Sequence, residues 1–503
     1  MKYILGIDIG TTAIKAAVVG DDGIVHGSAS SEYALTTLPT GEVEADLQLY
    51  IDAFGDAIRR AMKKSGVDKR DVKCVGFSST AETCVFLDEN YQPLCKVIAW
   101  MDTRAIQEAE YLSAHFDQRD IISKVGFDNF YAIHPISKIL AVKNKSPEIF
   151  AATRMFAQIK DYFIYELTGR FITEDSVASD HGFFDITNRC YWQEALDFVG
   201  MDRRYLPELT EPGAEIGMIT PKAAEKYGLS LDTRINVGAF DQACGAIGAG
   251  NIMPGIASES TGSALVTVAT IDRLNPDSKG DVPTLCSGIP GKYMYQPYCT
   301  GSMIMKWYRD AFCAREKEIE AETGLSAYTQ MDEMVRATDP GADGLIMLPY
   351  FQGSGIPDLN EKASGVFYGV SASHTRGHFI RAIMEGLAIA LKRMVECEEK
   401  LGAAMTEMRS LGGGSQSKVW CQIKADILGV PVKVISNSEN TACMGCAILA
   451  GVANGIWPSL EEATERFVSI QETYYPNPEH AAVYAAAYEK YVEITNALNP
   501  IFR

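Results

Sequence analysis

The stretch "YILGIDIGTTAIKAAVV", residues 3–19, decides the fold class of this chain. Tyr3–Ile9 is rich in β-branched residues and has the length of a strand. A second apolar run, Ala13–Val19, resumes directly after a Gly-Thr-Thr tip, which predicts a hairpin rather than a strand followed by a helix. One carboxylate, Asp8, lies inside the first run. Because Gly, Asp and Thr all favour turns, a purely structural turn explains this stretch as well as a binding loop does.

Composition indicates a two-domain protein that does not bind phosphate backbones. A chain of 503 residues is too long for one core. Its 46 basic and 65 acidic residues give a net charge of −19, so nucleic acid and anionic membranes are poor partners. Asp8 interrupts the first apolar stretch, and no charge-free apolar run of about 18 residues follows, so we expect neither a signal peptide nor a membrane span. These features predict a cytoplasmic protein.

The twelve cysteines lack a spaced framework, which favours reduced thiols. Cys443 and Cys446 form a CxxC pair in "NTACMGCAILAG". A zinc site needs two further ligands, and neither a second CxxC nor a pair of histidines lies nearby. We therefore interpret the pair as small core residues on a helix.

Strands and helices alternate along the chain, the pattern of an α/β protein. Residues 47–64 and 104–115 have helical spacing, whereas "DVKCVGFSS" and "KVIAW" are typical of strands. The weakest join lies near residues 243–255, which are dense in Gly and Ala. Directly after it, "IASESTGSALVTVAT" (256–270) repeats the design of the opening stretch, a strand, a small Thr-Gly-Ser tip and a second strand. This echo suggests a duplicated fold with two phosphate loops.

Both tips suit phosphate binding. Glycine lets the backbone approach an anion closely, and successive N–H groups with Thr hydroxyls can line a concave site. Asp8 beside the tip of Gly10, Thr11 and Thr12 could hold Mg²⁺ through waters, and Lys15 could supply a charge to the phosphate. The chain has neither the GxxxxGK[ST] motif of a P-loop nor a strand–GxGxxG–helix unit.

The stretch "INVGAFDQACGAIGAG" (235–250) is the next informative one. Residues 235–240 are predicted as a strand and residues from Ala243 onward as a helix, which places Asp241 at the carboxyl end of a strand. An aspartate here can simply cap the helix. Beside a phosphate loop it can instead accept the proton of an attacking hydroxyl.

Near the C-terminus, "LGGGSQSKVWCQIKADILG" puts three glycines between a strand and an amphipathic helix. Such a turn can bring backbone against a flat ligand such as adenine, although a plain Gly-rich connector explains this element equally.

Taken together and in order, these motifs resemble the FGGY carbohydrate kinases of the actin-like ATPase superfamily. "GIDIGTT" and "STGS" are similar to the two phosphate motifs of the family, "FDQACGAIGAG" to its catalytic-Asp motif and the three-glycine stretch to its adenosine motif. "GVFYGVSASHTRGHFIRAIMEGLA" (365–388) resembles its C-terminal signature, and "IAWMDTRA" its W-x-D-x-R segment.

The resemblance implies an α/β fold of two ribonuclease-H-like domains, residues 1–244 and 245–503, with an interdomain cleft. It further implies a sugar kinase that uses ATP and Mg²⁺, with Asp241 as base and Asp8 as the metal residue. The implied ATP and phosphate contacts are Gly10, Thr11, Thr12, Lys15, Thr261, Gly262, Gly413, Gly414 and Ser417. The implied substrate contacts are Thr80, Glu82, Trp100, Asp102, Asp241 and Gln242.

The substrate segment departs from the closer family patterns. Glycerol kinases have Q-R-E-T where this chain has T-A-E-T at residues 80–83, so Ala81 replaces the Arg that grips a small polyol. "LPYFQGSGIPD" likewise has Ser354 and Gly355 where many members carry Glu-Arg. The resulting open pocket favours a pentulose or a sugar alcohol over glycerol. Glycerol, other small polyols and autoinducer-type sugars stay alternative substrates. An actin-like or sugar-sensing ATP-binding protein stays the alternative to an enzyme. Trp100 can equally be a core residue, and a homodimer is possible.

Overall fold

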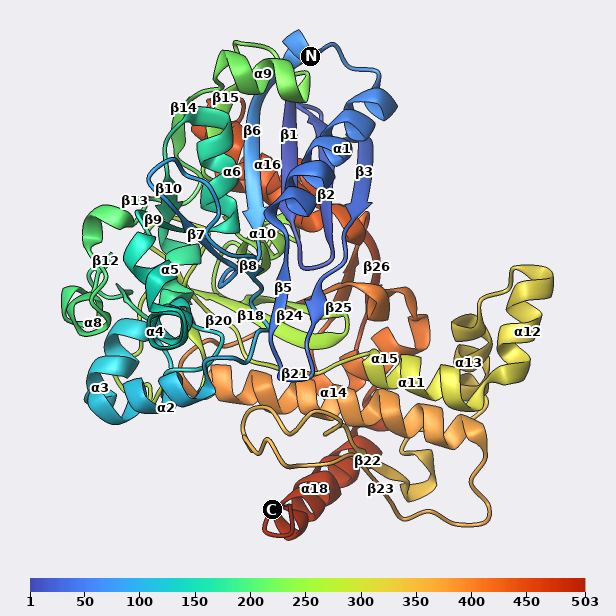
Figure 1. Ribbon diagram of the computed structural model, residues 1–503. Coiled ribbons are helices and arrows are strands. Elements are labelled where there is room, and N and C mark those ends of the chain that lie inside the picture. The colour runs from blue at the N-terminus through green and yellow to red at the C-terminus, as the bar shows by residue number, and fades with distance from the viewer. Residues whose placement is uncertain (503) are drawn as a thin grey trace. The chain divides into compact units, whose positions relative to one another are not determined.

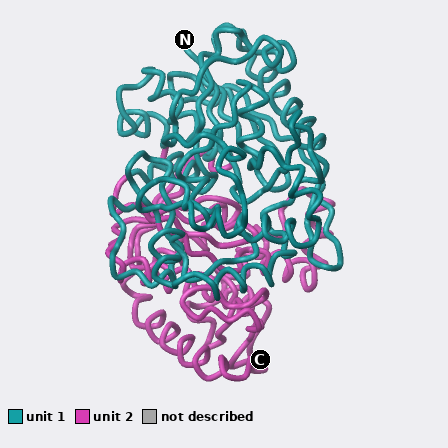
Figure 2. Tube along the Cα trace, turned by 60° about the vertical axis from the view of Figure 1, so that its left-hand side comes forward, with its two compact units in different colours: residues 1–252, 271–294, 440–468 teal, residues 253–270, 295–439, 469–503 magenta. Residues whose placement is uncertain are grey.

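In this computed structural model, residues 1–502 are described, and they form two compact units that interleave along the chain (Figure 2). Unit 1 comprises Met1–Ile252, Ile271–Met294 and Asn440–Val468. Unit 2 comprises Met253–Thr270, Tyr295–Glu439 and the segment that begins at Ser469. The predicted boundary between residues 244 and 245 falls inside helix α10 (Asp241–Gly248), which belongs wholly to unit 1.

The main sheet of unit 1 has the strand order β14-β15-β6-β1-β2-β3, with β16 also paired to β6. The predicted N-terminal hairpin is confirmed, because β1 and β2 pair antiparallel with Asp8 opposite Lys15. Strand β6 runs parallel to β1 on its other side, with Ser78 opposite Asp8. The strands are β1 (Tyr3–Ile9), β2 (Ala13–Gly20), β3 (Val25–Glu32), β6 (Val72–Ser79), β14 (Glu215–Met218), β15 (Arg234–Asn236) and β16 (Ala239–Phe240).

Helices cover this sheet, and α16 rests directly on two of its strands. In Figure 1, α16 (Thr441–Ala453, orange-red) lies behind β1 and β6. A Cβ atom on Gly6 would lie 2.1 Å from the Cys443 carbonyl oxygen, and one on Gly76 would lie 2.3 Å from that of Cys446. Only glycine therefore lets this helix rest directly on the strands. The predicted core role of the CxxC pair is confirmed, since both thiols are buried on α16.

The predicted helix at 47–64 is confirmed as α1, and that at 104–115 begins two residues later, as α2. The further helices of unit 1 are α1 (Leu47–Ser65), α2 (Ile106–His115), α3 (Gln118–Asp120), α4 (Pro135–Lys145), α5 (Pro147–Ala152), α6 (Ile159–Thr168), α7 (Asp175–Ala178), α8 (Gln193–Val199), α9 (Pro221–Tyr227) and α17 (Leu460–Phe467). Its further strands are β4 (Thr36–Thr37), β5 (Val43–Ala45), β7 (Cys84–Leu87), β8 (Val97–Ile98), β9 (Met155–Gln158), β10 (Ile172–Glu174), β11 (Phe184–Asp185), β12 (Cys190–Tyr191), β13 (Glu208–Thr210) and β19 (Thr284–Cys286).

Unit 2 repeats the pairing pattern of unit 1, which confirms the internal echo. Strands β17 and β18 form an antiparallel hairpin, β24 runs parallel to β17, and β25 runs parallel to β24. In unit 1, β1, β2, β6 and β15 hold the corresponding places in the same order. The strands are β17 (Ile256–Thr261), β18 (Ala264–Ile271), β21 (Tyr298–Thr300), β22 (Ile346–Leu348), β23 (Val366–Tyr368), β24 (Glu407–Leu411), β25 (Val432–Ile435) and β26 (Ile470–Tyr474), with β20 (Tyr293–Tyr295) where the chain enters the unit. The helices are α11 (Met303–Phe312), α12 (Ala314–Thr323), α13 (Ala327–Arg336), α14 (Arg376–Lys400), α15 (Lys418–Leu428) and α18 (Ala481–Leu498).

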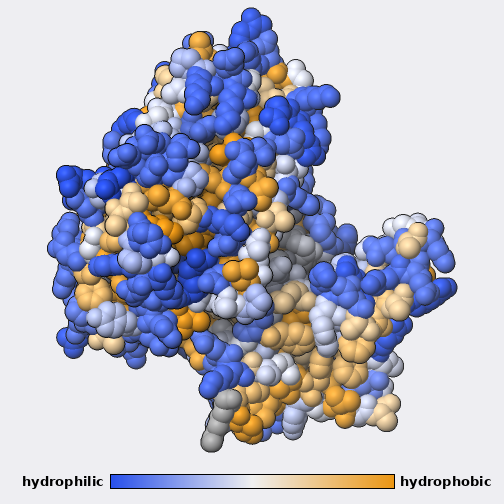
Figure 3. All heavy atoms as spheres, in the orientation of Figure 1, coloured by the Kyte–Doolittle hydropathy of each residue, from blue (hydrophilic) through white to orange (hydrophobic). Residues whose placement is uncertain are grey.

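Within residues 1–502, none of the helices combines the length and the apolar character that crossing a membrane requires. Figure 3 shows mostly hydrophilic residues on the visible face, in keeping with the strongly acidic composition.

Candidate functional site

Asp8 lies in a row of polar side chains that crosses three strands of unit 1. It has Lys15 on one side and Ser78 on the other, and the Ser78 hydroxyl donates a hydrogen bond of 2.8 Å to Asp8 Oδ1. Burial raises the pKa of Asp8, and the Lys15 charge and the Ser78 hydrogen bond lower it only in part. A buried carboxylate of this kind is stabilised by an added cation, so the site suits Mg²⁺, which binds through one or two carboxylates together with waters and phosphates.

The hairpin tip beside Asp8 is held by its own unit. The Gly10 N–H donates to the Ala13 carbonyl oxygen at 3.1 Å, and the Tyr33 hydroxyl donates to the Gly10 carbonyl oxygen. The indole N–H of Trp100 donates to Thr11 Oγ1 at 2.9 Å. A hydroxyl that accepts in this way still has its own proton to donate, so Thr11 can bind an anion while Trp100 fixes its position.

Asp241 follows a break that the sequence did not predict. The expected strand 235–240 is divided into β15 and β16 at Gly238, which has φ of +69°, and a Cβ atom there would lie 1.7 Å from the Phe77 carbonyl oxygen. Because Ala239 pairs with Ser78, which also pairs with Asp8, Asp241 emerges at the sheet edge where Asp8 lies. The N-cap of α10 is Phe240, with Asp241 the first helical residue.

Asp241 is partly exposed, but one oxygen of its carboxyl group is buried and unsatisfied. Its Oδ1 atom is buried and has no hydrogen-bond partner among the described residues. Burial raises the pKa of Asp241 to about 8, and the negative charges of Asp8 and Glu82 act in the same direction, against the hydrogen bonds of Gln242. A group with these properties can accept a proton from a bound hydroxyl.

A chain of fully buried polar groups fixes the start of α10. The Phe240 N–H donates to Ser176 Oγ at 2.9 Å, and that hydroxyl donates to Glu174 Oε2 at 2.7 Å. Glu174 Oε1 in turn forms a 2.6 Å ion pair with Lys160. The sequence analysis missed this chain, although the polar run "TEDSVASDH" (173–181) between apolar stretches was a visible signal.

Glu82 and Trp100 are joined through a buried lysine that the sequence analysis also missed. Lys138 donates to the backbone carbonyl oxygens of Glu82, Ala99 and Trp100 at 2.8, 2.9 and 3.0 Å. Glu82 adopts φ of +57°, rare outside glycine, and burial raises the pKa of its carboxyl group to about 7. Thr80 lies two residues earlier, buried, with its N–H bonded to the Ile9 carbonyl oxygen at 3.0 Å. Lys138 thus fixes backbone around two of the predicted substrate residues.

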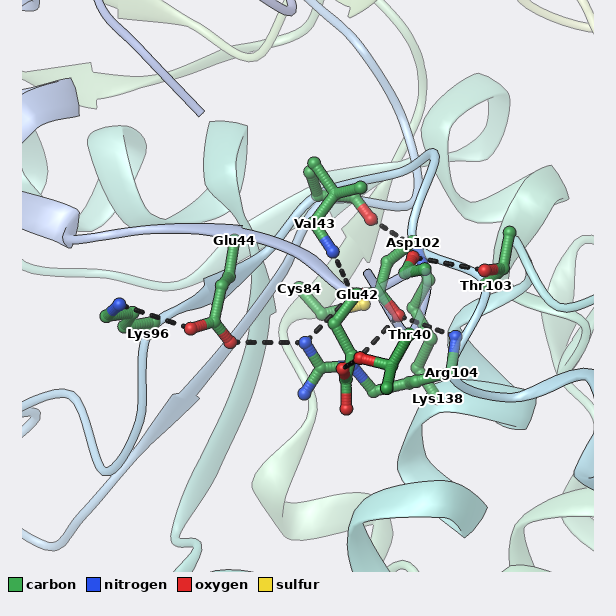
Figure 4. Close-up of polar contacts among 12 residues, drawn as sticks. Thr40, Glu42, Val43, Glu44, Cys84, Lys96, Asp102, Thr103, Arg104 and Lys138 are labelled. Atoms are coloured by element: carbon green, nitrogen blue, oxygen red, sulfur yellow. Dashed lines mark hydrogen bonds and ion pairs between the residues drawn. The ribbon is translucent and has the colours of Figure 1, made fainter. Parts of the chain in front are cut away.

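Asp102 is occupied by structural contacts (Figure 4). Its fully buried carboxylate accepts from the Val43 N–H at 2.6 Å and from the backbone and guanidinium of Arg104 at 2.8–2.9 Å. Arg104 also pairs with Glu44 at 3.2 Å. These bonds hold the W-x-D-x-R segment in place, and direct contact of Asp102 with a substrate stays a prediction.

In unit 2, the structure brings Thr261 and the glycine turn together. A Cβ atom on Gly414 would lie 2.6 Å from Thr261 Cβ, so the turn rests on the hairpin tip, with Gly413 exposed beside it. The Thr261 hydroxyl itself donates to Glu259 at 2.5 Å and accepts from Lys424 at 2.8 Å. Ser417 caps α15 and donates to Asp332 at 2.8 Å. The Gly262 carbonyl oxygen accepts from the N–H of Ser302 at 2.8 Å and from its hydroxyl at 2.7 Å, so internal bonds occupy much of this predicted loop.

Comparison with known proteins agrees with this architecture. Residues 3–248 match the N-terminal domain of the FGGY family of carbohydrate kinases, and residues 280–454 match its C-terminal domain. The xylulose kinase of Bacillus subtilis strain 168 is 29% identical over 497 residues, which cover 98% of this chain and 97% of that one. The crystal structure of ligand-bound xylulose kinase from Lactobacillus acidophilus superposes with a TM-score of 0.90 at 25% identity, covering 99% and 98% of the two chains. A gluconate kinase structure from the same organism has a TM-score of 0.89 at 26% identity, with the same coverage.

Proposed function

We propose that this chain, which belongs to the FGGY family of carbohydrate kinases, transfers the γ-phosphoryl group of ATP to a hydroxyl of a pentulose. The observation that carries the proposal is the enclosed, unpartnered Oδ1 of Asp241 at the sheet edge that also bears Asp8. Sugar alcohols are the nearest alternative substrates, since Ala81 beside Glu82 leaves the pocket without a cationic side chain at that position.

In the proposed reaction, Asp241 Oδ1 accepts the proton of the sugar hydroxyl as that oxygen bonds to the γ-phosphorus. The bond between the γ-phosphorus and the bridging oxygen breaks, and ADP leaves with the electron pair. Gln242 and the Ser176 chain keep the carboxyl group oriented through the first turn of α10.

Asp8 is the residue proposed to hold Mg²⁺, oriented by Ser78. When bound there, the ion would neutralise charge that develops on the transferring phosphoryl group. Thr11, Thr12 and Lys15 would contact phosphate oxygens, and in unit 2 we propose nucleotide contacts for Gly262, Gly413 and Gly414. Contacts of Thr261 and Ser417 with nucleotide require their present internal hydrogen bonds to be exchanged. We further propose a cytoplasmic location, supported by twelve cysteines that are all free thiols.

The direct test is sugar-dependent release of ADP by the purified protein with MgATP and a panel of ketopentoses, sugar alcohols and glycerol. We expect turnover with a ketopentose and none without sugar. If glycerol is the one compound of the panel that is turned over, the substrate is glycerol and not a pentulose. ATP hydrolysis that no sugar stimulates would favour an actin-like ATPase and reject the proposal.

A further inference from the structure

Asp180 is a buried acid whose carboxyl group is incompletely hydrogen-bonded. It is 3% exposed, on the short turn Ser179–His181 that follows α7, and its Oδ2 atom has no hydrogen-bond partner among the described residues. Burial raises the pKa of Asp180 well above its ordinary value, and the charges of Glu82 and Asp241 raise it further. The geometry that brings this turn toward Asp241 is the 2.9 Å hydrogen bond from the Phe240 N–H to Ser176, which lies in α7 just before the turn.

The residue after it is also unsatisfied. His181 is 1% exposed, and neither of its ring nitrogens has a partner among the described residues. Burial lowers the pKa of His181 to about 3, so the ring is neutral at pH 7 and offers one donor and one acceptor. Buried polar atoms in native proteins are hydrogen-bonded in the large majority of cases. The His181 ring lies against Phe183 and Tyr191. The unsatisfied oxygens of Asp180 and Asp241 belong to segments joined by the hydrogen bond between Ser176 and Phe240, and they favour a ligand with several hydroxyl groups.

The rigid placing of this turn supports a binding role. Ser179 Oγ accepts from the Cys286 N–H at 2.9 Å and donates to the Asp175 carbonyl oxygen at 2.7 Å. Ser176, three residues earlier, holds Phe240. The backbone that bears Asp180 is thus held through Ser179, and α7, which precedes it, is held through Ser176 to the residue before Asp241.

The charges near Asp180, Glu82 and Asp241 affect whether a neutral or an anionic sugar can bind. Lys138 lies near Glu82, but its ammonium group is engaged by three backbone carbonyl oxygens. His134, like His181, has a pKa lowered to about 3 by burial and is neutral at pH 7. An anionic sugar bound here would add a negative charge and keep Asp241 protonated, so that it could not accept the hydroxyl proton. A neutral sugar would instead donate hydrogen bonds and favour the ionised acids.

We propose that Asp180 is a substrate-contacting residue that hydrogen-bonds a sugar hydroxyl other than the phosphorylated one, and that Asp180, Glu82 and Asp241 together select a neutral polyhydroxyl substrate over a sugar carboxylate. This inference rests on the proposed function and deepens it. It separates this chain from a gluconate kinase, although one of the similar solved structures is a gluconate kinase.

The test compares wild type with Asp180→Ala, Asp180→Asn and the control Glu398→Ala. Glu398 is also a buried carboxyl group, with its pKa raised to about 8, but it lies in unit 2 and is bonded to Thr267 at 2.8 Å. Substrates are D-xylulose, D-ribulose, xylitol and D-gluconate, and the readouts are kcat and KM for sugar and for ATP, with melting temperature to confirm folding.

We expect Asp180→Ala to lower kcat/KM for the neutral sugar about 10- to 100-fold, mainly through KM, with KM for ATP within twofold. Asp180→Asn, which keeps the shape and the hydrogen-bonding capacity, should lose less and covers the case in which the Ala variant does not fold. Glu398→Ala should leave the sugar KM unchanged, and D-gluconate should be at least 100-fold poorer than the best neutral sugar.

A folded Asp180→Ala protein with an unchanged sugar KM would overturn the residue assignment, and so would an equal rise in Glu398→Ala. Preference for D-gluconate would overturn the charge selection. If wild type releases no ADP with any compound, the proposed function itself fails, and this inference fails with it. If wild type is active and substitution of Asp180 changes neither kcat nor KM, only the inference fails.

Discussion

The two hairpins of this molecule have the same strand pairing, but the buried acids on their first strands differ in how fully they are paired. In unit 1, Asp8 on β1 accepts a hydrogen bond from Ser78 on the parallel strand β6. In unit 2, Glu259 on β17 is paired in the same way with Ser410 on β24 and accepts a hydrogen bond from it. The unit 2 acid also forms a 2.6 Å ion pair with Lys424, in which both side chains are at most 1% exposed.

This difference supports a structural role for Glu259 and the proposed catalytic role for Asp8. Glu259 is satisfied by Lys424, Thr261 and Ser410, so its charge stabilises unit 2 and is unavailable to a ligand. Asp8 lies opposite Lys15, yet burial still raises its pKa. A duplicated strand arrangement thus keeps an acid in both copies, and only the acid of unit 2 is paired with a buried lysine at hydrogen-bond distance.

The largest expected effect concerns Asp241, which has no counterpart in the Glu259 network. Asp241→Asn keeps the shape but cannot accept the hydroxyl proton, so kcat should fall about 10²- to 10⁴-fold. Binding of MgATP, measured by calorimetry, should change little. Because burial raises the pKa of Asp241, removal of its charge should not lower the melting temperature at pH 8. Near wild-type turnover would show that Asp241 is not the base.

Matched substitutions of the two hairpin acids test the comparison itself. Glu259→Gln leaves Lys424 buried without its anion, and breaking such a pair costs about 3–5 kcal/mol of unfolding free energy. Asp8→Asn should leave stability nearly unchanged and raise the Mg²⁺ concentration needed for half-maximal rate at least tenfold. Denaturant unfolding and Mg²⁺ titrations of both variants measure this. Equal Mg²⁺ shifts in the two variants would refute the division of roles.

The pH dependence of kcat/KM tests the same difference between the acids of unit 1 and those of unit 2. The pKa of Asp241 is raised to about 8, so kcat/KM should rise with pH, close to tenfold per unit, and level off above about pH 8. Asp8→Asn removes one of the charges that raise this pKa, so its residual activity should level off at lower pH. Substitution of Glu398, in unit 2, should leave the profile in place. A profile that is flat from pH 6 to 9 would contradict the proposal.

Local features of the site were predictable and long-range ones were not. The hairpins follow from apolar runs around small tips, and Asp241 from its place between a strand and a small-residue helix. Lys424 lies 165 positions from Glu259 and Lys138 lies 56 positions from Glu82, so no local pattern joins them. Such pairs are set by which strands become neighbours. Asp180 was missed for the same reason, because its chemistry depends on acids brought to it by other elements.

The smallest expected effect concerns Ser176, which connects the ion pair of Glu174 and Lys160 to Phe240, the residue before the proposed base Asp241. In Ser176→Ala the Phe240 N–H loses its acceptor, and the first turn of α10 can shift. We expect kcat to fall about three- to tenfold, since catalysis depends on the orientation of Asp241, while KM for ATP stays constant. Ser179→Ala is the matched comparison for kcat, because Ser179 is equally buried and accepts from a backbone N–H, that of Cys286, which does not precede Asp241. Since Ser179 holds the turn that bears Asp180, its loss should raise the sugar KM and leave kcat nearly unchanged. Each alanine variant loses the two buried hydrogen bonds of its serine hydroxyl, so the two variants should lose similar stability, about 1–3 kcal/mol. Ser176→Thr, which keeps the hydroxyl, should retain most of the wild-type kcat. Equal losses of kcat in the two alanine variants would mean that Ser176 stabilises the fold without positioning the base.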